Sequence, residues 1–310
     1  MRRGVPSIRY LDTVTSTMDV AKEMIAASTS SATTSSSPLQ SFGVVAKVQT
    51  HGRGTSEKFW ASPSGNLMFT IGVPMERIAT EILPVLPLVV GIAVREAAQK
   101  CSGLGASTTG NAELIGDGGS AGGEHASATS NIPVKRNAVI MAKWPNDTVW
   151  DGRKLSGSLI EHADTHMLIG IGVNVDTAPE VADGGRPTVC LREIMREGGS
   201  SRMVGPSIPE LAETVWTELF QILERAETKE IGRGHVVQRF SAIMNWGLTL
   251  NKRNVERTAV RAVRLNSWGH LVVIPATTDD CEPNNNHNQE GQSSNKGNQN
   301  EEVLMSEYLF

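Results

Sequence analysis

The sequence predicts an α+β protein, with a large α+β domain over residues 1–240 and a small β domain over residues 245–310. Two observations support this division. Helix and strand patterns succeed one another up to about residue 240, whereas only short strand patterns follow after about residue 245. A chain of 310 residues is also long enough to bury one large core and to form a second, smaller unit.

Helix starts and prolines define the elements of the large domain. Ser16-Thr17-Met18-Asp19 fits a capping box, which opens a helix. Pro84 and Pro87 must lie in the first turns of a later helix or before it, because proline is not tolerated in a helix interior. The expected elements, in order, are a helix over 16–26, strands over 44–49 and 66–73, a buried helix over 81–100, a strand over 138–143, a hairpin of strands over 155–162 and 167–175, and an amphipathic helix over 209–228.

The small domain shows only strand patterns. Short strands are expected at 248–250, 259–265 and 270–274, and a last strand is expected within 303–308. Ser267-Trp268-Gly269 is expected to form the turn between the second and third of these strands. Several short strands at close spacing predict a small barrel.

Three polar segments, at about 27–40, 103–133 and 281–301, predict disordered insertions. They are rich in Ser, Thr, Gly, Asn and Gln, and they contain too little apolar surface to offset the entropy of the chain. Loops lengthen at a small cost in free energy, because the closure term rises only with the logarithm of length. We therefore expect no function for them.

Composition excludes several classes of protein. The net charge is -4, without a basic tail or stripe, which argues against binding to DNA. Three scattered cysteines predict neither a disulfide framework nor a zinc site. No apolar run is long enough to span a membrane, and no apolar segment of a secretory signal follows the basic first residues. We expect a cytoplasmic protein, and a mitochondrial presequence stays open.

The most informative stretch is KWPND at 143–147, followed after six intervening residues by KLSG at 154–157. Pro145 holds the residue before it extended, so a strand ends sharply there and the next two side chains can face a cavity. A hairpin with a surface lysine is the simpler interpretation. It does not explain why two lysines, an amide and a carboxylate surround one tight bend.

Two glycine motifs accompany this stretch. Gly52-Arg53-Gly54, with Trp60 downstream, lets the backbone approach a ligand and adds a cation with a planar set of donors. An ordinary glycine-rich turn with a solvated arginine is the alternative. GIGVN at 170–174 carries two glycines in an apolar strand, which suggests that something packs against the backbone there; a strand that crosses close to a helix explains it equally well.

Over roughly residues 8–275, these motifs resemble, in order and spacing, those of the biotin protein ligases, which also carry a Ser-Thr pair at a helix start. The resemblance implies a mixed, largely antiparallel sheet packed by helices and a small SH3-like β domain at the C-terminus. It also implies an enzyme that joins biotin to AMP from ATP, releases pyrophosphate, and passes the biotinyl group to one lysine of a carboxylase carrier domain, for example that of acetyl-CoA carboxylase.

The resemblance also assigns residues by motif, with Arg53 and Lys154 as the catalytic pair. It implies a biotin site of Ser16, Thr17, Gln49, Gly52, Arg53, Gly54, Lys154 and Gly157. It implies contacts to ATP or the adenylate from Arg53, Trp60, Asn146, Asp147 and Asn174. ATP and Mg²⁺ are the implied cofactors, biotin is the substrate, and no protein metal site is implied. The loop over 52–59 is expected to close over the adenylate and exclude water.

Two departures from the family pattern affect these expectations. Thr55 stands where many relatives carry a basic residue, which predicts weaker retention of the adenylate unless Lys58 compensates. The catalytic pattern begins by about residue 8, so we expect no DNA-binding domain before it. A lipoate-type protein ligase and a non-catalytic module that binds biotin or a carrier domain remain alternatives. A P-loop NTPase is disfavoured because the sequence lacks its motif. A homodimer through an edge strand is left open.

Overall fold

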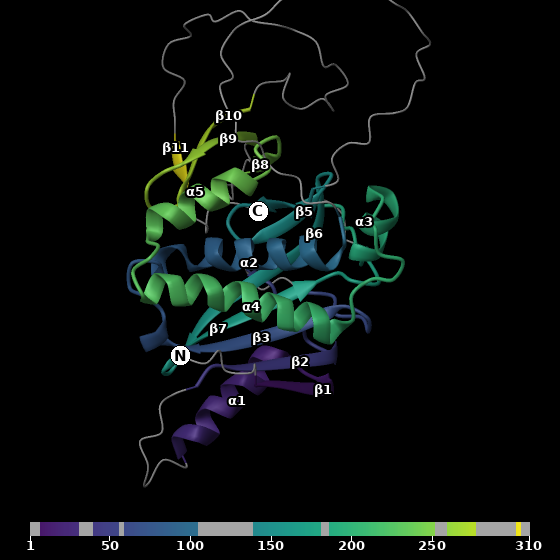
Figure 1. Ribbon diagram of the computed structural model, residues 1–310, viewed down its shortest axis with the longest axis vertical. Coiled ribbons are helices and arrows are strands. Elements are labelled where there is room, and N and C mark those ends of the chain that lie inside the picture. The colour runs from purple at the N-terminus through teal and green to yellow at the C-terminus, as the bar shows by residue number, and fades with distance from the viewer. Residues whose placement is uncertain are drawn as a thin grey trace, which may run out of the picture.

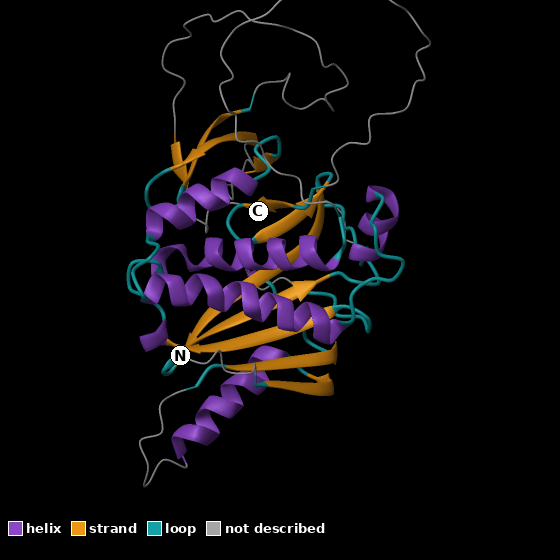
Figure 2. Ribbon diagram, viewed as in Figure 1, coloured by secondary structure: helices purple, strands orange, loops and turns teal. Residues whose placement is uncertain are grey.

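A computed structural model describes residues 7–30, 40–55, 59–104, 139–180, 186–251, 259–276 and 302–304. The insertions predicted at 103–133 and 281–301 lie largely outside these ranges. The described residues form a seven-stranded sheet, a layer of helices and a smaller four-stranded sheet (Figures 1 and 2).

The large sheet has the strand order β1-β2-β3-β7-β6-β5-β4. β1 and β2 are parallel, and every other neighbouring pair is antiparallel, which confirms a mixed, largely antiparallel sheet. The strands are β1 (Ile8–Val14), β2 (Phe42–Gln49), β3 (Leu67–Pro74), β4 (Met141–Lys143), β5 (Asp147–Trp150), β6 (Arg153–Ala163) and β7 (His166–Val173). The β6–β7 hairpin turns at Asp164, as predicted, with a positive φ of 50°.

Helices cover both faces of this sheet. On one face α2 (Leu86–Cys101) and α4 (Ile208–Glu227) lie side by side, and α5 (Arg233–Ile243) follows them (Figure 1). On the other face α1 (Thr17–Ser30) contacts β2, β3 and β7 around a small separate core. The alternation of a β-strand explains the two cores, since Val44 belongs to the α1 side and its neighbour Val45 to the α2 side. α3 (Leu191–Gly198) lies at one end of the sheet.

Several boundaries differ from the predictions. α1 continues to Ser30, although an insertion was predicted from residue 27; Ser28 donates to the carbonyl of Ile25 and so bonds within the last turns. The helix predicted over 81–100 begins only at Leu86. Its lead-in is the short 3₁₀ helix η3 (Leu83–Val85), which contains Pro84, and Pro87 lies in the first turn of α2. A second 3₁₀ helix, η2 (Met75–Arg77), follows β3.

The small sheet is antiparallel, with the order β11-β10-β9-β8. Its strands are β8 (Thr249–Asn251), β9 (Ala259–Leu265), β10 (Leu271–Pro275) and β11 (Glu302–Leu304). Within the described ranges it is an open sheet, and no pairing closes it into the predicted barrel. The predicted turn at 267–269 packs against the large domain: Trp144 donates its indole N–H to the carbonyl of Gly269 at 2.9 Å, and Arg233 stacks over Trp268 at 3.7 Å.

Buried side chains of the small sheet join the core formed by α2, α4 and the large sheet. The small sheet and the α2–α4 side of the large sheet therefore share one hydrophobic core, and the domain boundary near residue 240 stays a prediction. Among the described helices, none has the length and apolar character needed to cross a membrane.

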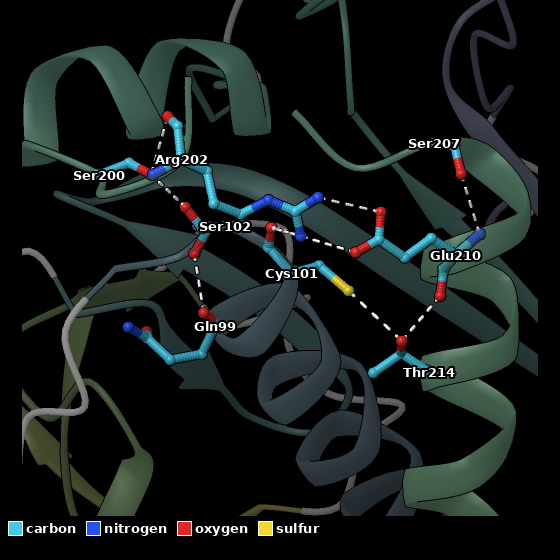
Figure 3. A network of polar contacts seen from close by, with 8 residues as sticks. All are labelled: Gln99, Cys101, Ser102, Ser200, Arg202, Ser207, Glu210 and Thr214. Carbon is cyan, nitrogen blue, oxygen red and sulfur yellow. Dashed lines mark hydrogen bonds and ion pairs between the residues drawn. The ribbon is translucent and has the colours of Figure 1, made fainter. Parts of the chain in front are cut away.

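A polar network fastens the end of α2 to the segment between α3 and α4 (Figure 3). Arg202 forms two bonds of 2.6 and 3.1 Å to the carboxylate of Glu210 and donates to the carbonyl of Cys101. Ser200 donates to the carbonyl of Ser102 at 2.6 Å. The hydrogen bond from Arg202 lowers the pKa of Glu210, and burial raises the pKa of the Cys101 thiol. None of these residues lines the pocket below, so the network stabilises the helical layer.

Candidate active site

A pocket opens on the α1 side of the large sheet, where segments far apart in the sequence meet. They are the start of α1, the end of β2, the loop before Trp60, and facing positions of β5, β6 and β7. Its lining consists of Ser16, Thr17, Met18, Gln49, Arg53, Gly54, Thr55, Trp60, Asp147, Lys154, Gly157, Ser158, Leu159, Gly170, Ile171 and Gly172. Every residue that the sequence assigned to a site is in this lining except Gly52, Asn146 and Asn174.

A chain of hydrogen bonds orients the polar groups at the start of α1. The side-chain carbonyl of Gln49 accepts from the backbone N–H and the hydroxyl of Thr17, at 2.8 and 3.0 Å. The amide of Gln49 donates to Ser62 at 2.9 Å, and Thr70 donates to Thr17 at 2.8 Å. Ser62 and Thr70 were not predicted, because nothing in the sequence links them to Thr17. The chain holds Gln49 and Thr17 in one orientation, as a polar binding site requires.

Arg53 enters the pocket from a short loop. Its guanidinium donates to Asp19 in the first turn of α1 at 2.7 Å, and both side chains are about one-third exposed (38% and 34%). The loop is closed by a bridge between Arg53 and Phe59 and by a bond from the N–H of Trp60 to the carbonyl of Gly52. A side chain on Gly52 would lie 2.3 Å from the carbonyl oxygen of Trp60, so only glycine fits this close approach. Lys58 lies outside the described residues.

Lys154 enters the pocket from β6 and shares a carboxylate with a second lysine. Its ammonium lies 3.0 Å from Asp147 Oδ1, and the ammonium of Lys143 lies 3.3 Å from Asp147 Oδ2. Burial raises the pKa of Asp147, but the charges of Lys154 and Lys143 outweigh burial and the pKa is lowered overall. Burial lowers the pKa of Lys143, and Asp147 opposes that shift. Asp147 is therefore an ionised carboxylate that pairs with both Lys154 and Lys143.

The backbone around Lys154 is held from two sides. It pairs with β5, and on its other side its N–H donates to Pro187 at 2.7 Å while its carbonyl accepts from Val189 at 3.0 Å. Asn174, which is 2% exposed, donates its side-chain amide to the carbonyls of Lys154 and Val189. The amide of Asn174 thus supports the backbone at Lys154. Asn174 is not among the lining residues, and its contact with the nucleotide stays a prediction.

Asn146 also bonds within the protein, since its amide donates to the carbonyl of Ser158 on β6. The predicted strand ends at the Trp144–Pro145 peptide, which is cis. β5 begins at the residue after Asn146, so the stretch predicted as a bend is a tight connection between two paired strands.

The glycines of the third motif make room for side chains of the protein itself. A Cβ on Gly172 would lie 2.3–2.6 Å from the ring of Trp60, and one on Gly170 would lie 2.9 Å from the sulfur of Met18. The ammonium of Lys154 lies 5.3 Å from the centre of the Trp60 ring. A Cβ on Gly157 would lie 3.0 Å from the same ammonium. The side chains of Trp60 and Lys154 therefore pack directly against glycines of the sheet.

The lining offers little for a metal ion. Within the described ranges, no group of three or more His, Cys, Asp or Glu side chains could hold one. Asp147, the carboxylate of the lining, already binds two lysines. Mg²⁺ usually reaches such sites on the phosphates of its nucleotide, with few protein ligands. Mg²⁺ would therefore be held by the phosphates of the nucleotide rather than by the described side chains.

Comparison with known proteins identifies the family. Residues 12–175 match the model of the Biotin/lipoate A/B protein ligase family. The crystal structure of biotin protein ligase from Leishmania major with biotinyl-5-AMP is 34% identical, with a TM-score of 0.62 over 88% of this chain and 96% of that one. Biotin protein ligase from Aquifex aeolicus, with biotin and ATP, is 21% identical with a TM-score of 0.61 over 89% and 94%, and supports the fold alone.

The chain belongs to the Biotin/lipoate A/B protein ligase family. Among curated proteins, it is 26% identical to the biotin–[acetyl-CoA-carboxylase] ligase of Mycobacterium tuberculosis over 56% of this chain and 53% of that protein. It is 28% identical to the chloroplastic biotin–protein ligase 1 of Arabidopsis thaliana over 49% and 32%. Within the family it is therefore a homologue of biotin protein ligases. It spans between about a third and about half of the length of these curated relatives.

Proposed function

We propose that this protein activates biotin with ATP to form biotinyl-5′-AMP, and then transfers the biotinyl group to one lysine of a carboxylase carrier domain. The observation that carries the proposal is the convergence of Arg53 and Lys154 on one pocket from unrelated parts of the chain. The solved relatives with bound biotin and biotinyl-5-AMP support the choice of substrate.

Charge explains why the first reaction needs both cations. A carboxylate oxygen of biotin attacks the α-phosphorus of ATP, and pyrophosphate leaves. Two anions must approach each other, and negative charge spreads over the phosphoryl oxygens in the transition state. Arg53 offers a planar donor pair to those oxygens, and Lys154 offers a point charge to the carboxylate. Fixed cations that meet developing charge lower such a barrier without covalent chemistry by the protein.

The second reaction uses the same groups. The neutral acceptor amine attacks the acyl carbon of the adenylate, the bond from that carbon to the phosphate oxygen breaks, AMP leaves, and the amine nitrogen loses one proton to water. Lys154, bound to the acyl oxygen, stabilises the negative charge that develops there. We assign biotin to the side of Ser16, Thr17 and Gln49, and the nucleotide to the side of Trp60.

Mass measurement of a carrier domain tests the proposal. The full chain is incubated with ATP, Mg²⁺, biotin and a recombinant biotin carrier domain. We expect the carrier to gain one biotinyl group on one lysine, and to gain none when ATP is omitted. An unmodified carrier in the complete reaction would reject the proposal, provided that a known ligase modifies the same carrier.

Two alternatives are tested by related assays. A lipoate-type ligase would support exchange of labelled pyrophosphate into ATP with lipoate rather than with biotin. A non-catalytic module would bind biotin but show no exchange with either acid. We expect exchange with biotin alone, and we expect it to vanish in Lys154→Ala while biotin binding persists.

Partners and location belong to the same proposal. We propose a biotin carrier domain as the protein partner, the cytoplasm as the compartment, and no role for DNA or membranes. We also propose that two copies associate through an outer strand of the large sheet, whose edges are β1 and β4. Sedimentation of the full chain at several concentrations measures this association, and a constant monomer mass argues against it.

A further inference from the structure

Lys143 is a buried lysine for which the proposed reaction has no direct use. Its side chain is 8% exposed, and it does not line the pocket. Lys154 is 28% exposed and does line it. Asp147 lies between the two, with one oxygen toward each ammonium. An isolated buried lysine carries a large desolvation cost, so its presence in this position needs an explanation.

The arrangement gives Asp147 a second partner behind the pocket. A Lys154 ammonium that turns away from Asp147 to a substrate carboxylate or phosphate gives up its 3.0 Å contact with Asp147 Oδ1. Leaving a buried carboxylate without a cation costs much free energy. If Lys154 were the only partner of Asp147, that cost would keep Lys154 bonded to it. With Lys143 at the other oxygen, Asp147 keeps a bonded cation throughout. Arg186 lies near the same carboxylate but donates its hydrogen bond to the carbonyl of Gly152. It therefore attracts Asp147 electrostatically without a hydrogen bond to it.

We propose that Lys143 is a positioning residue that keeps Asp147 paired, and thereby lets Lys154 exchange Asp147 for the substrate. This inference rests on the proposed function. It assigns a role to a residue outside the pocket lining, and that role acts on the availability of Lys154 rather than on the fold.

The test is a double-mutant cycle in the biotin-dependent exchange of pyrophosphate into ATP. In Lys143→Met, Asp147 retains Lys154 as its bonded partner, so we expect kcat/KM for biotin to fall on the order of tenfold, as is typical of coupled neighbouring charges. Adding Asp147→Asn should then raise kcat/KM again, because the retaining charge is gone. Lys47→Met, which removes a lysine from an exposed pair with Asp12, is the matched control and should change nothing.

The outcomes separate the possible explanations. Recovery in the double variant supports the inference, because loss of a merely structural lysine is not reversed by a second substitution beside it. No fall in Lys143→Met, or a double variant no better than Lys143→Met, overturns it. Absence of exchange in the unmodified protein overturns the proposed function instead.

Failure of Lys143→Met to fold, judged by its thermal transition, leaves a second comparison. On the Asp147→Asn background, Lys143 no longer has a carboxylate to hold. Replacing it with Met there should change kcat/KM less than about twofold. A tenfold change on that background would contradict the inference.

Discussion

The two cations of the pocket are held in opposite ways. Lys154 lies on a central strand whose backbone is paired on both sides, and its ammonium bonds to a buried carboxylate. Arg53 lies on a short loop closed by one bridge, and its guanidinium bonds to the partly exposed Asp19. The sheet therefore holds Lys154 in place, whereas Arg53 is carried by a short loop. Such a division suits a reaction that needs exact placement of one group and entry of a large nucleotide past the other.

Removing the fixed charge is the strongest way to test this contrast. We expect Lys154→Ala to lower biotin-dependent pyrophosphate exchange by at least about 100-fold, because fixed charges at a developing anion typically supply effects of that size. Thermal unfolding should show that the protein still folds. Lys22→Ala, which breaks a surface pair with Glu161, is the control. Equal activity in both variants contradicts the role of Lys154.

The buried carboxylate of Asp147 should also contribute measurably to the free energy of unfolding. The pKa of Asp147 is lowered from 3.8 in the folded protein, so its ionised form stabilises the fold at any pH above that value. The contribution is lost as the pH falls through the folded pKa. We expect Asp147→Asn to reduce the free energy of unfolding by about 2 kcal/mol at pH 7.

Urea denaturation at pH 7, 5 and 3.5 measures this difference for the unmodified protein and the variant. The difference in the free energy of unfolding between the two proteins should be constant between pH 7 and pH 5, and it should become smaller at pH 3.5. A gap that widens on acidification contradicts the lowered pKa.

The contact between Gly172 and the Trp60 ring allows a test of the geometry of the pocket. We expect Gly172→Ala to lower exchange on the order of tenfold, because the new methyl overlaps the Trp60 ring and displaces it. The Michaelis constant for ATP should rise more than that for biotin, since we assign Trp60 to the nucleotide. Gly234→Ala is the matched control, because no atom lies within 4 Å of its added Cβ. Similar kinetics for the two variants argue against this assignment.

Removing Arg53, the cation on the loop, should lower the activity without lowering the stability of the fold. We expect Arg53→Ala to reduce exchange on the order of tenfold and to leave the thermal transition nearly unchanged, because exposed ion pairs contribute little. Asp19→Asn removes the partner without removing the cation, so it should retain activity within about threefold. Loss of activity in Asp19→Asn as large as that in Arg53→Ala would mean that the pair itself, and not the free guanidinium, is needed.

The smallest expected effect concerns Thr55, which lines the pocket beside Arg53. A basic residue at this position should hold the adenylate phosphate more strongly. We expect Thr55→Arg to release less free biotinyl-AMP into solution, by about threefold for one added exposed charge. Chromatography of the supernatant measures the release. Equal release from both proteins removes the argument that Thr55 weakens retention.

Local patterns in the sequence predicted much of this fold, and interactions between distant segments account for what they missed. The capping residues at Ser16 and the hairpin over 155–175 carry their own signals. β1 does not, since exposed residues such as Arg9 and Asp12 break any simple alternation. β5 was interpreted as part of a bend because its identity as a strand depends on pairing with β4 and β6.

The same limit applies to the site. Motifs predicted Arg53, Lys154, Trp60 and the glycines near one another. The pairing of Arg53 with Asp19 and the sharing of Asp147 by two lysines were not predicted, because both depend on how the chain brings charges together. The nucleotide contact of Asn174, which only the family resemblance implied, stays a prediction, and the bonds from its amide to the backbone of Lys154 and Val189 were not foreseen.

A crystal structure with a stable acyl-sulfamate analogue of biotinyl-AMP tests the central claim most directly. We expect the ammonium of Lys154 and the guanidinium of Arg53 to lie within about 3.5 Å of the acyl–sulfamate linkage, from opposite sides. Lys154 should then have left Asp147 Oδ1, and Lys143 should remain at Oδ2. An analogue bound in this pocket with either cation turned away from the linkage would contradict the account.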